Sequence, residues 1–225
     1  MLDYIIGLVF PPKCIFCGNI LAINENREIC SGCFEKIPFI SMQHGRLLKR
    51  DLSERCLDDV VCVCEYSGMV KEAILRYKFR NKAGYYRAFA KLLAEKLKEM
   101  TNYRKFDIIV SVPLHKRKER VRGYNQSLLM SKVISKETGI KENSRILSRI
   151  RDTGSQSLTQ SKIDRYTNVK DAFKVNNIDA VRDKSVVVVD DILTTGYTVG
   201  ECSRALKEAG AKVVIAAVIA SGRKY

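Results

Sequence analysis

Residues 186–198 constrain the fold of this chain more than any other segment. They open with four consecutive valines, which predict a fully buried strand of a parallel sheet, because such a strand is covered on both faces. Two adjacent acids, Asp190 and Asp191, follow where we expect the strand to end, and a Thr-Thr-Gly-Tyr-Thr loop leads into a predicted helix over 199–209. Ligands of open α/β sheets bind beyond the carboxyl ends of the strands. The segment therefore predicts an α/β fold with a ligand site at this loop.

The loop is suited to a phosphate group and the acid pair to a sugar. Helix N-termini bind phosphates through free N–H groups, and Gly196 lets the backbone approach a bound group closely. The hydroxyls of Thr194, Thr195 and Thr198 add hydrogen-bond donors. Two carboxylates beside the phosphate would accept hydrogen bonds from vicinal hydroxyls of a sugar. The pattern predicts a sugar-phosphate site, and the alternative is an ordinary strand end followed by a helix cap.

This segment resembles the ribose-phosphate fingerprint of the type I phosphoribosyltransferases. The resemblance implies that Asp190 and Asp191 are the catalytic pair and contact the 2′ and 3′ hydroxyls of phosphoribosyl pyrophosphate (PRPP). It also implies a Mg²⁺ ion that accompanies PRPP. Tyr197 departs from the pattern, because relatives usually have a small residue there. The loop residues that the resemblance assigns to the 5′-phosphate are Thr194, Thr195, Gly196 and Thr198.

Four of the eight cysteines form two Cys-x-x-Cys pairs near the start of the chain. Two such pairs, twelve residues apart, present four thiolates at the spacing that a structural Zn²⁺ requires. In a cytosolic chain this pattern indicates a metal site rather than disulfides, and the metal would supply the folding energy of so short a segment. We expect a structural clamp, with contact to nucleic acid or redox activity as alternatives. The predicted zinc ligands are Cys14, Cys17, Cys30 and Cys33.

The rest of the chain predicts alternating strands and helices around a parallel sheet. We expect strands over 59–66, 106–112, 184–190 and 212–220, and helices over 69–77, 85–100 and 199–209. Cys62, Cys64 and Cys202 are expected as small core residues. The predicted domains are an N-terminal helix with the zinc ribbon over 1–40 and a phosphoribosyltransferase-like domain over 59–225.

The chain is strongly basic, with 40 Lys and Arg against 25 Asp and Glu, and this balance indicates a polyanionic partner or substrate. We expect a basic run to contact a nucleic-acid backbone, although a solvated helix face has the same composition. The residues of this run are Lys116, Arg117, Lys118, Arg120 and Arg122. Nearby aromatic residues that we expect to stack bases are Tyr77, Phe79, Tyr85, Tyr86 and Tyr124.

Further segments resemble one family over essentially the whole chain. They are the Tyr77-Lys78 pair, Val-Pro-Leu-His over 112–115, Arg-Gly-Tyr-Asn-Gln over 122–126, the Arg, Thr and Gln pattern over 149–158, and Arg-x-x-Asn over 165–168. Together with the four cysteines and the acid pair, they are similar to the ComF family. Its members are competence-associated proteins with a phosphoribosyltransferase-like domain.

The resemblance implies two further parts of the site. Backbone amides of the turn Ser111, Val112 and Pro113 would bind pyrophosphate, with His115, Lys116 and Arg117 close by, although Ser111 stands where the family has proline. Cations and N–H donors there would stabilise the charge that grows on this leaving group. The polar stretch 149–165 corresponds to a loop that closes over PRPP, and a plain linker is the alternative. The candidate residues in this stretch are Thr153, Gln156 and Arg165.

The function that we expect is a phosphoribosyltransferase-like protein that binds Mg²⁺-PRPP at 190–198 and acts in natural competence and DNA uptake. Single-stranded DNA and a competence helicase or other DNA-uptake proteins are the expected partners. A nucleic-acid-binding scaffold and a nucleotide-sensing regulator are the alternatives, because this fold also occurs without transferase activity. The sequence does not name the acceptor. It contains no apolar run long enough to span a membrane and no signal peptide, so we expect a cytoplasmic location.

Overall fold

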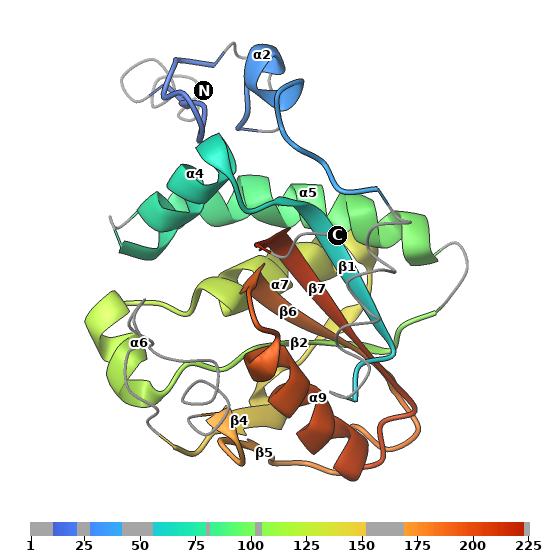
Figure 1. Cartoon of the computed structure of the whole chain (residues 1–225). Coiled ribbons are helices and arrows are strands. Elements are labelled where there is room, and N and C mark those ends of the chain that lie inside the picture. The colour runs from blue at the N-terminus through green and yellow to red at the C-terminus, as the bar shows by residue number, and fades with distance from the viewer. Residues whose placement is uncertain are drawn as a thin grey trace, which may run out of the picture.

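The main element of the structure is a parallel sheet. The computed structural model describes residues 11–21, 28–41, 56–79, 82–101, 105–151 and 169–222. Within these residues the sheet has five strands in the order β1-β7-β6-β2-β3, all of them parallel. The strands are β1 (Asp59–Glu65), β2 (Ile108–Ser111), β3 (Lys141–Glu142), β6 (Ser185–Leu193) and β7 (Val213–Ser221). The sheet confirms the predicted α/β fold (Figure 1).

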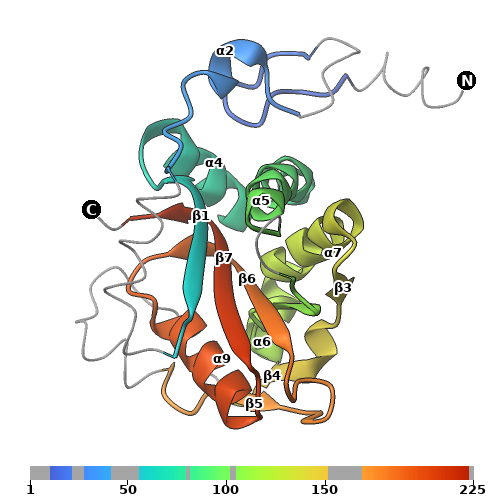
Figure 2. The same ribbon diagram turned by 90° about the vertical axis from the view of Figure 1, so that its right-hand side faces the viewer.

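Helices cover both faces of this sheet, as Figure 2 shows. The helices are α4 (Gly68–Phe79), α5 (Tyr86–Thr101) and α7 (Gln126–Thr138) on one face and α9 (Tyr197–Glu208) on the other. The valines of β6 alternate between the two layers: Val187 and Val189 belong to the buried cluster with α4, α5 and α7, and Val186 and Val188 to the cluster with α9. The four-valine run is therefore buried on both faces, as predicted.

The strand β6 continues through the acid pair, so the prediction that it ends at Asp190 was wrong. It stays paired with β7 as far as Leu193 opposite Ser221, whereas its pairing with β2 stops at Val189 opposite Ser111. Backbone pairing to one neighbour is enough to keep the strand extended. The two acids therefore lie on a strand whose β2-facing side has just become free, and this opens room for a ligand.

A second, smaller sheet was not expected from the sequence. It pairs β4 (Leu147–Arg149) with β5 (Phe173–Val175) in antiparallel fashion. Strands of three residues are too short to give a periodic signal. The remaining short elements are α2 (Ser31–Phe34), η2 (Ala83–Tyr85), α6 (Lys116–Arg122) and η3 (Ser144–Ile146).

The N-terminal ribbon packs directly onto the body of the protein. Its buried residues Ile15, Phe16 and Leu21 belong to the same core cluster as the buried faces of α4 and α5. Figure 1 shows the ribbon, with α2, beside α4 at one end of the molecule. The helix that we predicted before the ribbon lies outside the described residues. Cys62, Cys64 and Cys202 are buried, which confirms them as core residues.

Candidate functional site

A cavity of about 700 Å³ opens where β2 and β6 end. It falls within the range of about 300–1,000 Å³ that is usual for small-molecule sites. Its wall contains Asp190 and Asp191, the whole 194–198 loop, and side chains from α4, α6 and α7. We call it the acid-pair cavity. The structure thus brings the two acids and the predicted phosphate loop together around one space.

The two acids of the cavity have different surroundings. The hydroxyl of Ser127, in the first turn of α7, donates a hydrogen bond to Asp190 Oδ1 over 3.0 Å. Asp191 is only 8% exposed, and its Oδ1 lies 2.8 Å from the Nζ of Lys78, in the last turn of α4. Asp190 is therefore held by a neutral donor and Asp191 by a cation.

Burial and, to a lesser degree, the neighbouring charge of Asp191 raise the pKa of Asp190 from its ordinary value of 3.8 to about 7. Lys78, the Asp191 N–H and the Ser127 hydroxyl act in the opposite direction, because each of them stabilises the carboxylate. A carboxyl group that is partly protonated near neutral pH marks this cavity as a candidate for binding or catalysis.

This raised pKa predicts how the stability of the protein depends on pH. The folded state binds the Asp190 proton more tightly than the unfolded state does. The free energy of unfolding therefore decreases as the pH rises from 3.8, the ordinary pKa of aspartate, through about 7, its pKa in the folded protein. Asp190→Asn removes the ionisation, so its melting temperature should exceed that of the wild type at pH 8 by more than at pH 5. Each 1 kcal/mol corresponds to about 2–4 °C for a chain of this size. Asp179→Asn, at an 88% exposed position, serves as the control, and an equal difference at both pH values would contradict the argument.

The phosphate loop lies between the end of β6 and the start of α9. Gly196 is the N-terminal cap of α9 and has φ of 76°, a left-handed conformation that favours glycine. It is followed by twelve helical residues, so the loop meets the positive end of a full helix. Thr194, Thr195 and Thr198 all line the acid-pair cavity, and Tyr197 does so beside them. The local geometry is that of an anion-binding strand–loop–helix turn.

The basic run forms the short helix α6, and the cavity divides its cations into two groups. Arg117, Lys118 and Arg122 line the acid-pair cavity, whereas Lys116 and Arg120 are exposed and are not part of its wall. His115 caps the helix by accepting a hydrogen bond from the Arg117 N–H. From the sequence we expected these five cations to act together on one partner. In the structure, three of them line the same cavity as the two acids.

The turn that the resemblance assigned to pyrophosphate has its amides engaged elsewhere. The Ser111 N–H donates to Ser144 Oγ over 2.8 Å, and the Val112 N–H donates to the Val189 carbonyl over 2.9 Å. Pro113 has no N–H to offer. Of these three residues Val112 lines the acid-pair cavity, while Ser111 and Pro113 line a separate cavity. The amides of this turn are thus not available as donors in this arrangement.

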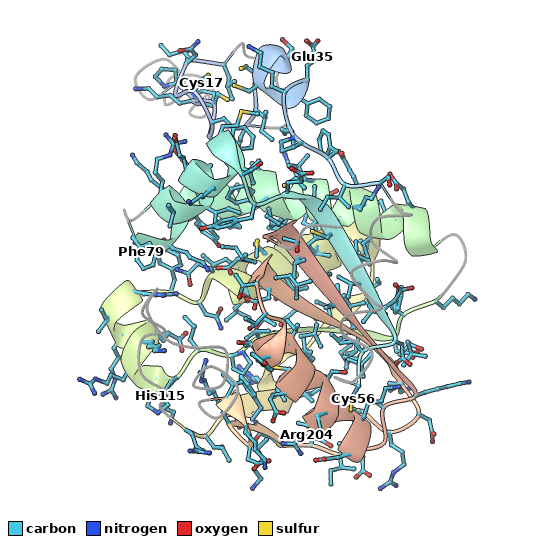
Figure 3. The ribbon with its side chains drawn as sticks, in the orientation of Figure 1. Cys17, Glu35, Cys56, Phe79, His115 and Arg204 are labelled. Carbon is cyan, nitrogen blue, oxygen red and sulfur yellow. The ribbon has the colours of Figure 1, made fainter. Side chains whose placement is uncertain are left out.

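The aromatic residues near the cations differ in their exposure. Tyr77 is 0% exposed, so the prediction that it stacks on a base was wrong. Phe79 is 67% exposed, lines the acid-pair cavity and has the Arg122 guanidinium 5.5 Å from its ring centre. Figure 3 shows Phe79 on the same side of the molecule as His115. Tyr85, Tyr86 and Tyr124 are half-buried and pack against the core.

Three site residues could not have been assigned from the sequence alone. Lys78 and Ser127 come from helices far along the chain from the acids, and Arg149 reaches the cavity from β4. Lys78 and Arg149 carried a signal only as members of segments in the family resemblance, without a role in contact with the acids, and Ser127 carried none. The loop candidates Thr153, Gln156 and Arg165 lie outside the described residues.

The four cysteines of the ribbon form a second candidate site. The Sγ atoms of the four residues all lie within 4.8 Å of one another, and Cys17 Sγ is 3.8 Å from Cys30 Sγ. Tetrahedral Zn²⁺ with bonds of about 2.3 Å requires sulfur atoms about 3.8 Å apart, so the residues fit the ion. Gly18 has φ of 80° and turns the first knuckle back, with its N–H bonded to the Cys14 carbonyl. The spacing and the packing both support a structural zinc.

The electrostatics of these thiols also favour a cation. Burial raises the pKa of Cys14, but hydrogen bonds from the backbone of Cys17, Cys30 and Phe16 and from the Cys17 thiol together outweigh burial and lower this pKa to about 7. The pKa of Cys33 is raised to about 12 by burial and by the neighbouring thiols. Four thiolates are therefore not stable together without a positive ion between them. Cys56 and Cys62 lie outside this cluster.

The fold and the site define a phosphoribosyltransferase domain that carries a zinc ribbon. The family model of the phosphoribosyl transferase domain matches residues 85–225, and the model of the double zinc ribbon domain matches residues 5–62. The described part of the latter region holds one cluster of four thiols, at Cys14, Cys17, Cys30 and Cys33.

Curated relatives define the group more narrowly. Competence protein F of Haemophilus influenzae is 30% identical over 90% of this chain and 93% of its own length. The DNA utilization protein YhgH of Salmonella typhimurium is 29% identical over 89% of this chain and 86% of its own length. The chain belongs to the competence protein F family. Among solved structures, a purine phosphoribosyltransferase from Pyrococcus horikoshii matches 62% of this chain and 75% of its own, with 20% identity and a TM-score of 0.40.

In the part of the chain that the structure describes, no helix combines the length and the apolar character needed to cross a membrane.

Proposed function

We propose that the acid-pair cavity binds PRPP together with Mg²⁺ and that the chain acts as a phosphoribosyltransferase. The observation that carries this proposal is the meeting of an acid pair, an anion-binding loop and the three cations of α6 around one cavity of about 700 Å³. Asp190 and Asp191 would accept hydrogen bonds from the ribose hydroxyls. The 194–198 loop at the start of α9 would bind the 5′-phosphate.

The cations of α6 suit the pyrophosphate end of the same ligand. Arg117, Lys118 and Arg122 line the cavity, and they would stabilise the charge that develops on pyrophosphate as it leaves C1′. The occupied amides at Ser111 and Val112 make these side chains the more suitable donors. When bound, Mg²⁺ would neutralise part of the same charge, and the carboxylates and ligand oxygens offer the oxygen donors that it prefers.

A comparison of ligands tests this proposal. In the presence of Mg²⁺, PRPP should raise the melting temperature more than ribose 5-phosphate or pyrophosphate does, because only PRPP engages the acids, the loop and the cations together. A ligand at 100 times its Kd stabilises the folded state by about 2.7 kcal/mol. Release of pyrophosphate on addition of candidate acceptors would establish transfer. Binding without release would favour the nucleotide-sensing alternative, and no stabilisation by PRPP would refute the proposal.

The names of the relatives support a role for this chemistry in the handling of DNA. The relatives are called competence and DNA utilization proteins, and this chain carries a net charge of +15. We therefore propose a role in DNA uptake, with single-stranded DNA as a partner. The specific observation for DNA contact is the outer side of α6, where Lys116 and Arg120 are exposed outside the acid-pair cavity. The exposed ring of Phe79 lies at the cavity edge, where it offers a stacking surface.

The two groups of cations on α6 allow the two roles to be separated. If single-stranded DNA binds along the outer side of α6, the double variant Lys116→Gln with Arg120→Gln should lose two phosphate contacts. The slope of log K against log salt should then become less steep by about 1.4, because each contact contributes about 0.7. PRPP affinity should stay near the wild-type value. Arg117→Gln with Lys118→Gln, the matched pair inside the cavity, should weaken PRPP binding instead. The reverse pattern, or equal effects of both pairs, would contradict this division.

A further inference from the structure

Three consecutive residues at the end of α4 connect the zinc ribbon with the acid-pair cavity. Arg76, Tyr77 and Lys78 contact the ribbon, the start of α7 and the acid pair, respectively. Successive residues of a helix project about 100° apart, so neighbours in the sequence face different partners. One turn of helix thus contacts both candidate sites.

Arg76 holds the first knuckle of the ribbon. Its Nη2 donates hydrogen bonds to the carbonyl oxygens of Ile15, over 3.1 Å, and of Phe16, over 2.9 Å. These two residues lie between the zinc ligands Cys14 and Cys17 and are 2% and 6% exposed. Hydrogen bonds from a charged donor at a partly buried position are among the stronger ones. The knuckle therefore has a fixed position on α4 as long as its own fold is intact.

Tyr77 and Lys78 continue the connection to the acids by two routes. Lys78 Nζ lies 2.8 Å from Asp191 Oδ1. The hydroxyl of the fully buried Tyr77 donates to the carbonyl of Gln126, the first residue of α7, over 2.9 Å. The next residue of α7 is Ser127, whose hydroxyl binds Asp190. A movement of this turn of α4 therefore reaches both carboxylates.

We propose that Arg76 is a positioning residue through which the zinc-loaded ribbon sets the geometry of the acid pair, so that zinc and PRPP bind cooperatively. The inference rests on the proposed function. Loss of the metal releases the knuckle, and Arg76 loses two acceptors in a half-buried position. The last turn of α4 must then rearrange to let the guanidinium reach water, and Lys78 moves with it. By reciprocity, PRPP must tighten zinc binding by the same factor.

The test measures zinc affinity by competition with a zinc-selective chelator, with and without saturating PRPP and Mg²⁺. For the wild type, PRPP should tighten zinc binding at least fivefold, the lower end of the range of about 5–150-fold for coupled sites. Arg76→Met should still bind zinc, because all four thiols remain, but PRPP should no longer change its affinity. Arg76→Lys keeps a cationic donor and should recover part of the effect. Lys71→Met, an exposed position of the same helix, should behave as the wild type.

Calorimetry with PRPP on the wild type separates the outcomes. If PRPP binds but zinc affinity does not change, or if Arg76→Met retains the full effect, the coupling is refuted and the proposed function stands. If PRPP does not bind, the proposed function fails. The connection between the acid pair and the ribbon is then tested by measuring the zinc affinity of the Lys78→Met variant in the absence of PRPP. That variant should bind zinc at least about twofold more weakly than the wild type, and an unchanged zinc affinity would refute the coupling too.

Discussion

Replacing Asp190 and Asp191 together by asparagine should weaken PRPP binding by about 100- to 10,000-fold. Each carboxylate contributes a charged acceptor, and a hydrogen bond to a charged group is worth about 1.5–3 kcal/mol. The loss of two such bonds gives the expected range, because about 1.4 kcal/mol corresponds to a tenfold change in affinity. The double variant also leaves Lys78 without its partner in the cavity. The measurement is titration calorimetry with PRPP at saturating Mg²⁺.

The control for this experiment removes two charges away from the cavity. Asp179→Asn with Asp183→Asn changes the net charge equally, at exposed positions that are not part of the cavity wall. This control should bind PRPP as the wild type does. The acid-pair variant should remain folded, because an asparagine in place of Asp190 cannot ionise, and burial opposes the ionisation of that aspartate. Equal PRPP affinity in a folded acid-pair variant would show that the acids do not bind the ribose.

Cys14→Ser should lose zinc almost completely and make the N-terminal segment sensitive to protease. Cys14 is 1% exposed, and its Sγ accepts a hydrogen bond from the Cys30 N–H, so it joins the two knuckles as well as the metal. The hydroxyl that replaces it is a poor zinc ligand. The metal content of the purified protein and the rate of limited proteolysis provide the measurements.

The matched control is Cys56→Ser, because Cys56 is exposed and lies outside the four-thiol cluster. It should keep the full zinc content of the wild type. Retention of zinc by Cys14→Ser would overturn the assignment of the site. Loss of zinc from both variants would point to instability of the chain rather than to a specific ligand set.

The sequence predicted the parts of the fold that depend on local pattern. Four consecutive valines indicated a strand buried on both faces, and the order of acids, loop and helix indicated a phosphate site at its end. The cysteine spacing indicated a metal cluster, and the four Sγ atoms do lie within 4.8 Å of one another. These features were predictable because each is encoded within a few consecutive residues.

The features that were missed depend on contacts between distant segments. Nothing near residue 78 indicates that Lys78 pairs with Asp191, because that contact exists only once α4 packs beside β6. The end of β6 was misplaced for a similar reason, since strand pairing with β7 outlasts pairing with β2. The exposure of Tyr77 was also misjudged, because its neighbours are hydrophilic while its own side chain points into the core.

The most direct test of the central claim is calorimetric titration of the zinc-loaded wild type with PRPP at saturating Mg²⁺, repeated in the presence of pyrophosphate. If the acid-pair cavity binds PRPP as proposed, the titration should saturate at one PRPP per chain, and pyrophosphate should compete because it occupies the same cations. A titration that shows no saturable binding up to millimolar PRPP would contradict the account.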